Sequence, residues 1–223
     1  MLAKKTQVCY TKNTMKQTDK KLALAELERL YPDAKPALHY TTTYELLVAV
    51  VLSAQCTDER VNKVTEVLFK EHNTPQKMLL LNQEQLEKYI FSCGLYHSKA
   101  EHILSLSKDL VEKFNGQVPC TLEELRSLAG VGRKTANVVY SVAFNGDAIA
   151  VDTHVFRVAN RIGLTKANNP LNTEKGLMKI LDKNLWSKMH HYLIYLGRSF
   201  CKAGKPDCEN CPIKENCEKK IKR

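Results

Sequence analysis

Hydrophobic residues recur at intervals of three and four along most of the chain from Leu22 onward, which is the spacing of one face of an α-helix. The first such segment, LALAELERL, stops before Pro32, because proline is poorly tolerated inside a helix. No alternating valine-rich run is bounded by a two-residue turn, so the signals for hairpins and sheets are missing. We therefore predict an all-α fold, with further helices over residues 43–53, 58–69, 83–90, 98–114, 121–128, 134–143, 153–162, 172–181 and 188–198.

The division of the chain into parts is indicated only by changes in composition. The first 20 residues contain a single acidic residue and no hydrophobic periodicity, so we predict a disordered basic tail over 1–20. No repeat of fixed period, low-complexity block or long Gly/Ser linker follows. We predict one helical body over 36–146 and a second that joins 21–35 to 147–223.

The balance of charge points to an acidic partner. Lysine and arginine number 34 against 24 aspartate and glutamate residues, and the net charge of +10 is spread along the chain. Nucleic acid fits this distribution better than a membrane surface, because no strongly basic amphipathic segment stands apart. The alternative is a lysine-rich composition with no nucleic-acid partner. The longest apolar stretch is about half the ~20 residues that cross a bilayer, and no secretion signal is recognisable. We therefore expect a cytoplasmic monomer, nucleoid-associated if bacterial, with no membrane partner.

The segment LEELRSLAGVGRKTANVVYSVAF joins two helical patterns through a turn that contains Gly130 and Gly132. Glycine adopts positive φ at little cost, so we expect a tight turn with positive φ at these glycines. Such a turn would aim the free N–H groups of the second helix at a phosphate, with attraction added by the helix dipole and by Arg133. The alternative is a glycine-capped corner between helices that binds no ligand.

Lys134 and Asp152 are candidates for a reacting pair. Lys134 lies in the first turn of the second hairpin helix, where the helix dipole and Arg133 both disfavour the protonated amine. A neutral lysine in a partly desolvated cleft is the nucleophile that Schiff-base chemistry requires. Asp152, in IAVDTHVFRVANRIG, precedes a helical pattern as an N-cap, and a carboxylate there can stabilise an oxocarbenium-like charge or relay a proton. The alternatives are a lysine that only contacts phosphate and an aspartate that only caps a helix.

Four of the eight cysteines lie close together near the end of the chain, as Cys201, Cys208, Cys211 and Cys217. The other four are scattered singly, at positions 9, 56, 93 and 120, which is unlike a disulfide-rich secreted protein. Four converging thiolates require a partner, and we expect a bound metal. The spacing C-x6-C-x2-C-x5-C suits either a tetrahedral zinc ion or an iron-sulfur cluster, so the ligand types alone leave both open.

The string LAGVGRKTAN resembles the helix-hairpin-helix of DNA-binding proteins, and in particular that of the endonuclease III family of DNA glycosylases. The resemblance extends from about Leu22 to Cys217 and departs from the family at Ala129, where similar proteins carry proline. It implies a six-helix barrel with the hairpin at about 121–143, an iron-sulfur domain beside it, and a cleft between the two. Lys134 falls where the family has its attacking lysine, and Asp152 where it has an essential aspartate.

Further site residues follow only from the resemblance. Family members fill the space left by an extruded nucleotide with a glutamine and a hydrophobic residue, which match Gln55 and Leu95. Asp58 and His154 match residues that line the family's cleft.

The resemblance also favours an iron-sulfur cluster over a zinc ion. The cysteine spacing matches the [4Fe-4S] loop of the family, which implies one cluster per chain. The cluster would hold its loop so that two basic residues meet DNA phosphates, Lys202 and Lys205.

The resemblance implies a bifunctional DNA glycosylase that removes oxidised pyrimidines from duplex DNA and cuts abasic sites by β-elimination. One alternative is a non-catalytic iron-sulfur or zinc module that only binds DNA. Another is an adenine-specific monofunctional glycosylase, which would carry a small hydroxyl residue in place of Lys134.

Overall fold

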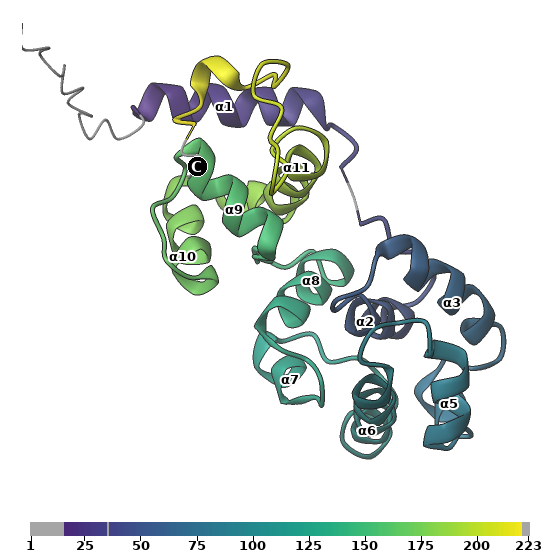
Figure 1. Ribbon diagram of the computed structural model, residues 1–223. Coiled ribbons are helices and arrows are strands. Elements are labelled where there is room, and N and C mark those ends of the chain that lie inside the picture. Colours follow the sequence, from purple (N-terminus) through teal and green to yellow (C-terminus); the bar gives the residue numbers. More distant parts are fainter. Residues whose placement is uncertain (1–15, 35, 220–223) are drawn as a thin grey trace, which may run out of the picture.

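The computed structural model describes residues 16–34 and 36–219, and no strand occurs within these ranges. One group of helices consists of α2 (Thr43–Leu52), α3 (Asp58–Glu71), α4 (Pro75–Met78), α5 (Gln83–Ile90), α6 (Tyr96–Phe114), α7 (Leu122–Ser127) and α8 (Arg133–Ala143). The other consists of α1 (Gln17–Leu30), α9 (Thr153–Ile162), α10 (Pro170–Ile180) and α11 (Trp186–Ser199), with the 3-10 turns η1 (Lys183–Leu185) and η2 (Lys214–Asn216). Figure 1 shows the two groups side by side, with α8 and α9 at their junction. In the described part of the chain, no helix has the length and apolar composition that crossing a membrane requires.

Most helices lie where the periodicity predicts them. The helices α5 and α9 have the predicted bounds, and the predicted tail is wrong from Gln17 onward, because α1 begins there. Two buried residues of α1, Ala23 and Leu27, pack it against the rest of its group, which stabilises the helix upstream of its hydrophobic repeat. Residues 1–15 of the predicted tail lie outside the described residues.

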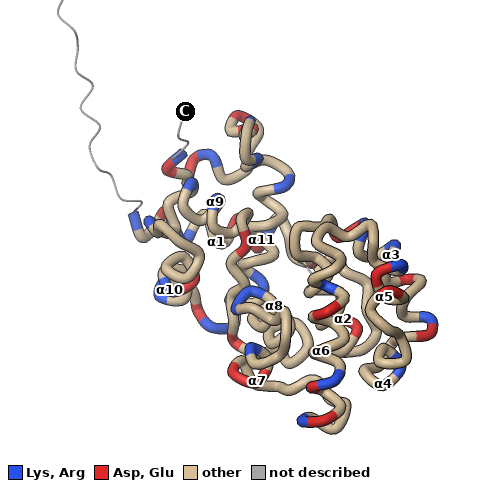
Figure 2. The backbone as a smooth tube through the Cα atoms, turned by 60° about the horizontal axis from the view of Figure 1, so that its bottom comes forward, with Lys and Arg blue, Asp and Glu red and all other residues tan. Residues whose placement is uncertain are grey.

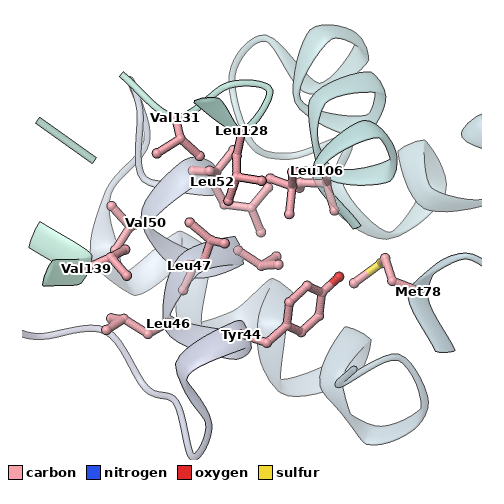
Figure 3. Close-up of a cluster of buried hydrophobic side chains, with 14 of the residues drawn as sticks. Tyr44, Leu46, Leu47, Val50, Leu52, Met78, Leu106, Leu128, Val131 and Val139 are labelled. Carbon is pink, nitrogen blue, oxygen red and sulfur yellow. The ribbon is translucent and has the colours of Figure 1, made fainter. Parts of the chain in front are cut away.

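The first group is built around α2. Its sequence TYELLVAVVL is hydrophobic on nearly every side, and nine of its ten residues are buried. A helix that is apolar all round is stable only inside a core. Figure 3 shows side chains of α2 facing Met78, Leu106 and Val139, which come from α4, α6 and α8. The buried end of α2 leads directly into the loop that carries Gln55.

A separate cluster of buried side chains holds the second group together. It contains Leu27 of α1, Val155 of α9 and Leu193 of α11. Ile213, in the cysteine-containing loop, is fully buried in the same cluster. The helix α1 contacts both α11 and η2, so the start of the described chain lies beside its end (Figure 1). The cysteine loop is therefore anchored on the second core.

Two ion pairs join the groups. Arg133 at the start of α8 donates two hydrogen bonds, of 2.8 and 2.7 Å, to the buried carboxylate of Glu174 in α10. Arg198 near the end of α11 donates one of 2.8 Å to Asp58 at the start of α3. Because each pair has one member in each group, the two pairs fix how the groups face one another.

Candidate active site

The helices α7 and α8 form the predicted hairpin, and the two glycines of its turn differ. Gly130 has a φ of +72°, and a Cβ there would lie 2.8 Å from Cβ of His102, so conformation and space both require glycine. Gly132 has φ −78° and ψ 177°, and a Cβ there would meet nothing within 4 Å. The expectation of positive φ is therefore wrong for Gly132, whose backbone is extended because it is the N-cap of α8. The space in front of this helix is open, and among the described side chains none caps it.

Arg133 and Lys134 are the first two residues of α8, but their side chains have different neighbours. The guanidinium of Arg133 is bound to Glu174, so its charge is already paired, and we interpret Arg133 first as a residue that positions α8. Lys134 lines a cavity between the two groups and remains exposed at its mouth. The desolvated cleft expected around this amine is therefore not complete in the protein without DNA.

Asp152 is the N-cap of α9, as predicted, and its Oδ1 accepts a hydrogen bond of 2.7 Å from the N–H of Val155. The extended segment before it is buried at Ile149. Asn137, one turn after Lys134 in α8, donates a hydrogen bond of 2.9 Å from its side-chain amide to the carbonyl of Ile149. This bond ties the segment that ends in Asp152 to the helix that carries Lys134.

The cavity brings Lys134 and Asp152 together with residues from both groups. It encloses about 650 Å3 of empty space, part of which is open to solvent. Its charged and titratable lining residues are Asp58, Lys134, Asp152, His190, His191, Tyr195 and Arg198. The site therefore combines an amine, two carboxylates, a guanidinium, a phenol and two imidazoles at the junction of the groups.

The rings of the two histidines of α11 are in contact, with centroids 3.8 Å apart and planes tilted by 41°. Burial lowers the pKa of His191 to about 4, and burial, followed by the neighbouring His191, lowers the pKa of His190 well below its usual value. Both rings are therefore neutral near pH 7. Nδ1 of His190 is buried and has no hydrogen-bond partner among the described residues.

His154 lies outside the lining of this cavity and faces α11. Its Nδ1 is 3.1 Å from Nη2 of Arg157, and a Cβ at Gly197 would lie 3.1 Å from the same nitrogen. Burial lowers the pKa of His154, and the charge of Asp152 opposes that shift. A neutral ring accepts the guanidinium N–H of Arg157 within α9, and the same nitrogen of Arg157 donates a hydrogen bond of 3.1 Å to the carbonyl of Gly197 in α11.

Gln55 and Leu95 lie in adjacent exposed loops of the first group. Gln55 has a φ of 52° and Leu95 a φ of 59°, a left-handed conformation that is uncommon for residues other than glycine. A Cβ at Gly94 would lie 3.1 Å from the carbonyl oxygen of Gln55, so the two loops are in contact. Leu95 is 60% exposed, which leaves a large hydrophobic side chain in solvent. Residues held in this strained conformation cluster at functional sites and ligand clamps.

The four C-terminal cysteines line one cavity, and all are free thiols: Cys201, Cys208, Cys211 and Cys217. Burial raises the pKa of Cys217 to about 11. The N–H of Lys219 lies 3.3 Å from the Cys217 sulfur, and Nη1 of Arg161 lies 3.8 Å from the Cys201 sulfur. These donors face sulfur atoms that would carry negative charge as thiolates. Within the described ranges, no three His, Cys, Asp or Glu side chains converge closely enough to hold a single ion.

Lys202 and Lys205 are exposed in the first part of this loop. Arg161 of α9 donates hydrogen bonds of 2.7 and 2.8 Å to the carbonyls of Lys202 and Ala203. Figure 2 shows basic residues at the start of α8, and acidic and basic residues side by side in this C-terminal segment, as in α3 and α5. The first part of the loop, which carries Lys202 and Lys205, is therefore held in place by α9.

Several residues of the site were not found from the sequence. The adjacent histidines 190 and 191 could have been noticed as a titratable pair in a helical pattern. Arg198, Asn137 and Arg161 carry no local signal, because their partners lie far away in the sequence.

Comparison with known proteins places these features in a wider context. Residues 48–183 match the model of the HhH-GPD superfamily of base excision DNA repair proteins. Endonuclease III of Rickettsia conorii is 51% identical over 187 residues, which cover 84% of this chain and 89% of that protein. Endonuclease III of Haemophilus influenzae is 46% identical over 208 residues, which cover 93% and 99%. A solved structure of a trapped endonuclease III–DNA covalent intermediate superposes with a TM-score of 0.88 at 48% identity, covering 92% of this chain and 96% of that one.

Proposed function

This chain belongs to the endonuclease III family within the HhH-GPD superfamily of base excision DNA repair proteins, and we propose that Lys134 and Asp152 carry its glycosylase and abasic-site lyase chemistry on duplex DNA. Membership confirms the predicted fold class and the DNA glycosylase function. The assignment of residues is supported by one observation above all. The first turn of α8 and the N-cap of α9 bring an amine and a carboxylate into one cavity.

In the proposed reaction, the neutral amine of Lys134 attacks C1′ of the damaged nucleotide and displaces the base. The resulting imine permits β-elimination, which cuts the strand 3′ to the lesion. Because Lys134 is exposed in the protein alone, bound DNA would complete the exclusion of water around it. Asp152 is oriented by its bond to the Val155 N–H, and its charge would stabilise positive charge on the sugar.

Reaching C1′ requires the nucleotide to leave the stack, at a cost of a few kcal/mol. Gln55 and Leu95 would fill the space that it leaves, since both project from strained, exposed loops on one side of the first group. Two neutral histidines, His190 and His191, line the cavity that would receive the extruded nucleotide.

Contacts with the DNA backbone would come from two places. The uncapped first turn of α8 offers N–H groups across the open space at Gly132, where a phosphate can approach closely. Lys202 and Lys205 would supply charge from the C-terminal loop.

A [4Fe-4S] cluster fits the four C-terminal cysteines. A tetrahedral zinc ion needs all its sulfur ligands about 2.3 Å from one centre, whereas a cube gives each thiolate its own iron and spreads the sulfurs apart. The four thiols line one cavity, and their spacing matches that of the family's cluster loop, which favours the cluster. When bound, the cluster would supply four metal–sulfur bonds that cross-link the loop. A colourless preparation with stoichiometric zinc and no iron or sulfide would overturn this assignment.

The finer parts of the proposal rest on family membership and on packing. The separation of buried side chains into two clusters supports domains at 36–146 and at 21–35 with 147–223. Oxidised pyrimidines are proposed as the damaged bases because the family acts on them. A cytoplasmic location stays a prediction.

Borohydride trapping with an abasic duplex tests the reacting pair. Reduction of the imine should leave a covalent complex with the native protein and none with Lys134→Ala. Lys108→Ala, which removes an exposed lysine of α6, is the matched control and should trap like the native protein. Asp152→Asn should fold, since an asparagine also caps a helix, and should trap much more slowly.

The same assay separates the alternatives. A DNA-binding module without catalysis, or a monofunctional adenine glycosylase, would leave no imine to reduce. Trapping that survives Lys134→Ala unchanged would show that another amine attacks, and the assignment of Lys134 would be wrong.

A further inference from the structure

Two of the cysteines that are scattered in the sequence lie together in the fold. Cys93 is fully buried in the first core, and Cys56 packs against the same cluster. A Cβ at Gly94 would lie 3.1 Å from the carbonyl oxygen of Gln55, so the backbones next to the two thiols touch. The two thiols are also near enough for the charge of Cys56 to raise the pKa of Cys93. A dithiol therefore joins the loops that carry Gln55 and Leu95.

The surroundings of this pair favour reaction at Cys56. Cys56 is partly exposed and directly precedes Thr57, the N-cap of α3, so it lies close to the positive end of that helix. Lys99 is buried beside both sulfurs, and its Nζ donates a hydrogen bond of 2.8 Å to the carbonyl of Leu52. Burial, followed by the charge of Cys56, raises the pKa of Cys93 to about 11. Cys56 is thus the thiol that an outside reagent can reach, and Cys93 is its inner partner.

We propose that Cys56 and Cys93 are an oxidisable dithiol, closed to a disulfide by a small-molecule disulfide such as oxidised glutathione, and that closure slows turnover on damaged duplex DNA. The effect on turnover rests on the function proposed above, whereas the formation of the bond does not.

The reaction is a two-step thiol–disulfide exchange. The thiolate of Cys56 attacks one sulfur of oxidised glutathione, an S–S bond breaks, and one glutathione thiolate leaves. The thiolate of Cys93 then attacks the sulfur of Cys56 and displaces the second glutathione. The two protons lost by the cysteines are taken up by the two glutathione thiolates. The pair gives up two electrons, and oxidised glutathione receives them.

Closure would move the loops that contact DNA. A disulfide holds its sulfurs about 2.05 Å apart, much closer than two thiols in van der Waals contact. Closure would draw the two loops together, and Gln55 adjoins Cys56 while Leu95 lies two residues after Cys93. A misplacement of about 1 Å can cost about 100-fold in rate, so we expect turnover to fall at least about tenfold.

The test treats the full-length protein with oxidised glutathione and maps its peptides without reduction. The native protein should yield a peptide pair linked through Cys56 and Cys93. Cys120→Ser, which changes an exposed free thiol, is the matched control and should yield the same pair. Cys56→Ala and Cys93→Ala should each abolish it, and Cys56→Ala suffices if the buried substitution prevents folding. Absence of the linked pair in the native protein would overturn the proposal.

Turnover on an abasic duplex is measured for each variant before oxidation, after oxidation, and after reduction with dithiothreitol. Each rate is expressed relative to that of the same variant in its reduced form. The native protein and Cys120→Ser should lose activity and regain it, while Cys56→Ala should keep it. An equal loss in Cys56→Ala would place the effect at another cysteine, and a linked pair with unchanged turnover would refute the effect on the loops. If the reduced protein forms no covalent complex with DNA under borohydride, the proposed catalysis is wrong. Peptide mapping still tests, independently of catalysis, whether Cys56 and Cys93 form a disulfide.

Discussion

The turn of the hairpin permits a sharp test, because its two glycines stand in opposite situations. At Gly130, alanine would meet two costs. A left-handed conformation costs about 1–2 kcal/mol for a residue with a Cβ, and φ there is +72°. The new methyl would also lie 2.8 Å from Cβ of His102, an atom next to the backbone of α6 that cannot swing aside. Overpacking of this kind costs about 1–3 kcal/mol.

Alanine also lowers the conformational entropy of the unfolded chain, which raises the free energy of unfolding by about 0.4–1 kcal/mol. The Gly130→Ala protein should therefore lose about 2–4 kcal/mol of unfolding free energy. For a chain of this size that corresponds to a Tm lower by roughly 5–15 °C.

At Gly132 the same substitution should affect binding and not stability. The φ of −78° suits alanine, and a Cβ there meets nothing within 4 Å. Alanine is a poorer N-cap than glycine, which lowers the free energy of unfolding by about 1 kcal/mol. Its smaller conformational freedom in the unfolded chain raises the free energy of unfolding by nearly the same amount. The methyl would, however, stand where a phosphate approaches the first turn of α8. Loss of one charge-assisted hydrogen bond costs about 1.5–3 kcal/mol, so affinity should fall by about tenfold or more.

Thermal unfolding followed by circular dichroism, and anisotropy of a labelled duplex at fixed salt, measure the two effects. The reasoning is refuted if Gly130→Ala melts with the native protein, or if Gly132→Ala binds DNA as tightly as the native protein does.

Three further substitutions test other contacts. Glu174→Gln removes the buried charge that holds Arg133. Urea denaturation should show that the free energy of unfolding falls by about 1–2 kcal/mol, a moderate loss because the guanidinium is partly hydrated. Glu59→Gln, which breaks an exposed ion pair, is the control and should leave the free energy of unfolding unchanged. Leu95→Ala should leave Tm unchanged, since the side chain is 60% exposed, but should lower the ratio of duplex to single-strand cleavage rates. The pKa of His191 is lowered to about 4, below the ~6.5 of an unfolded chain, so only the unfolded state gains a proton as pH falls between these values. Stability is therefore intact above about pH 6.5 and falls by about 3 kcal/mol toward pH 4; His191→Gln should flatten this dependence, and an unchanged slope in urea midpoints would contradict it.

Local features of the chain account for much of the fold and for the two central site residues. The helix α9 was predicted with its N-cap at Asp152, because a capping side chain acts within three residues of itself. Lys134 was placed in the first turn of α8 by a glycine turn directly before it. The helix α4 was missed, because four residues are too few to show a hydrophobic period.

The paired state of Arg133 could not be predicted in the same way. Its partner Glu174 lies 41 residues further along and is buried by the packing of α10 on α9. The sequence suggested a free guanidinium at the hairpin, and the structure places it in a bond between the two groups.

The sequence by itself determined the helices, the turn at Gly130 and the order of the chemical groups, because periodicity, capping and turn preference depend on neighbours within about four residues. Tertiary structure alone decided that Lys134 and Asp152 share a cavity with His190 and that Cys56 meets Cys93. These contacts join distant segments, so they depend on how whole helices pack around α2 and across the junction, which no local pattern encodes.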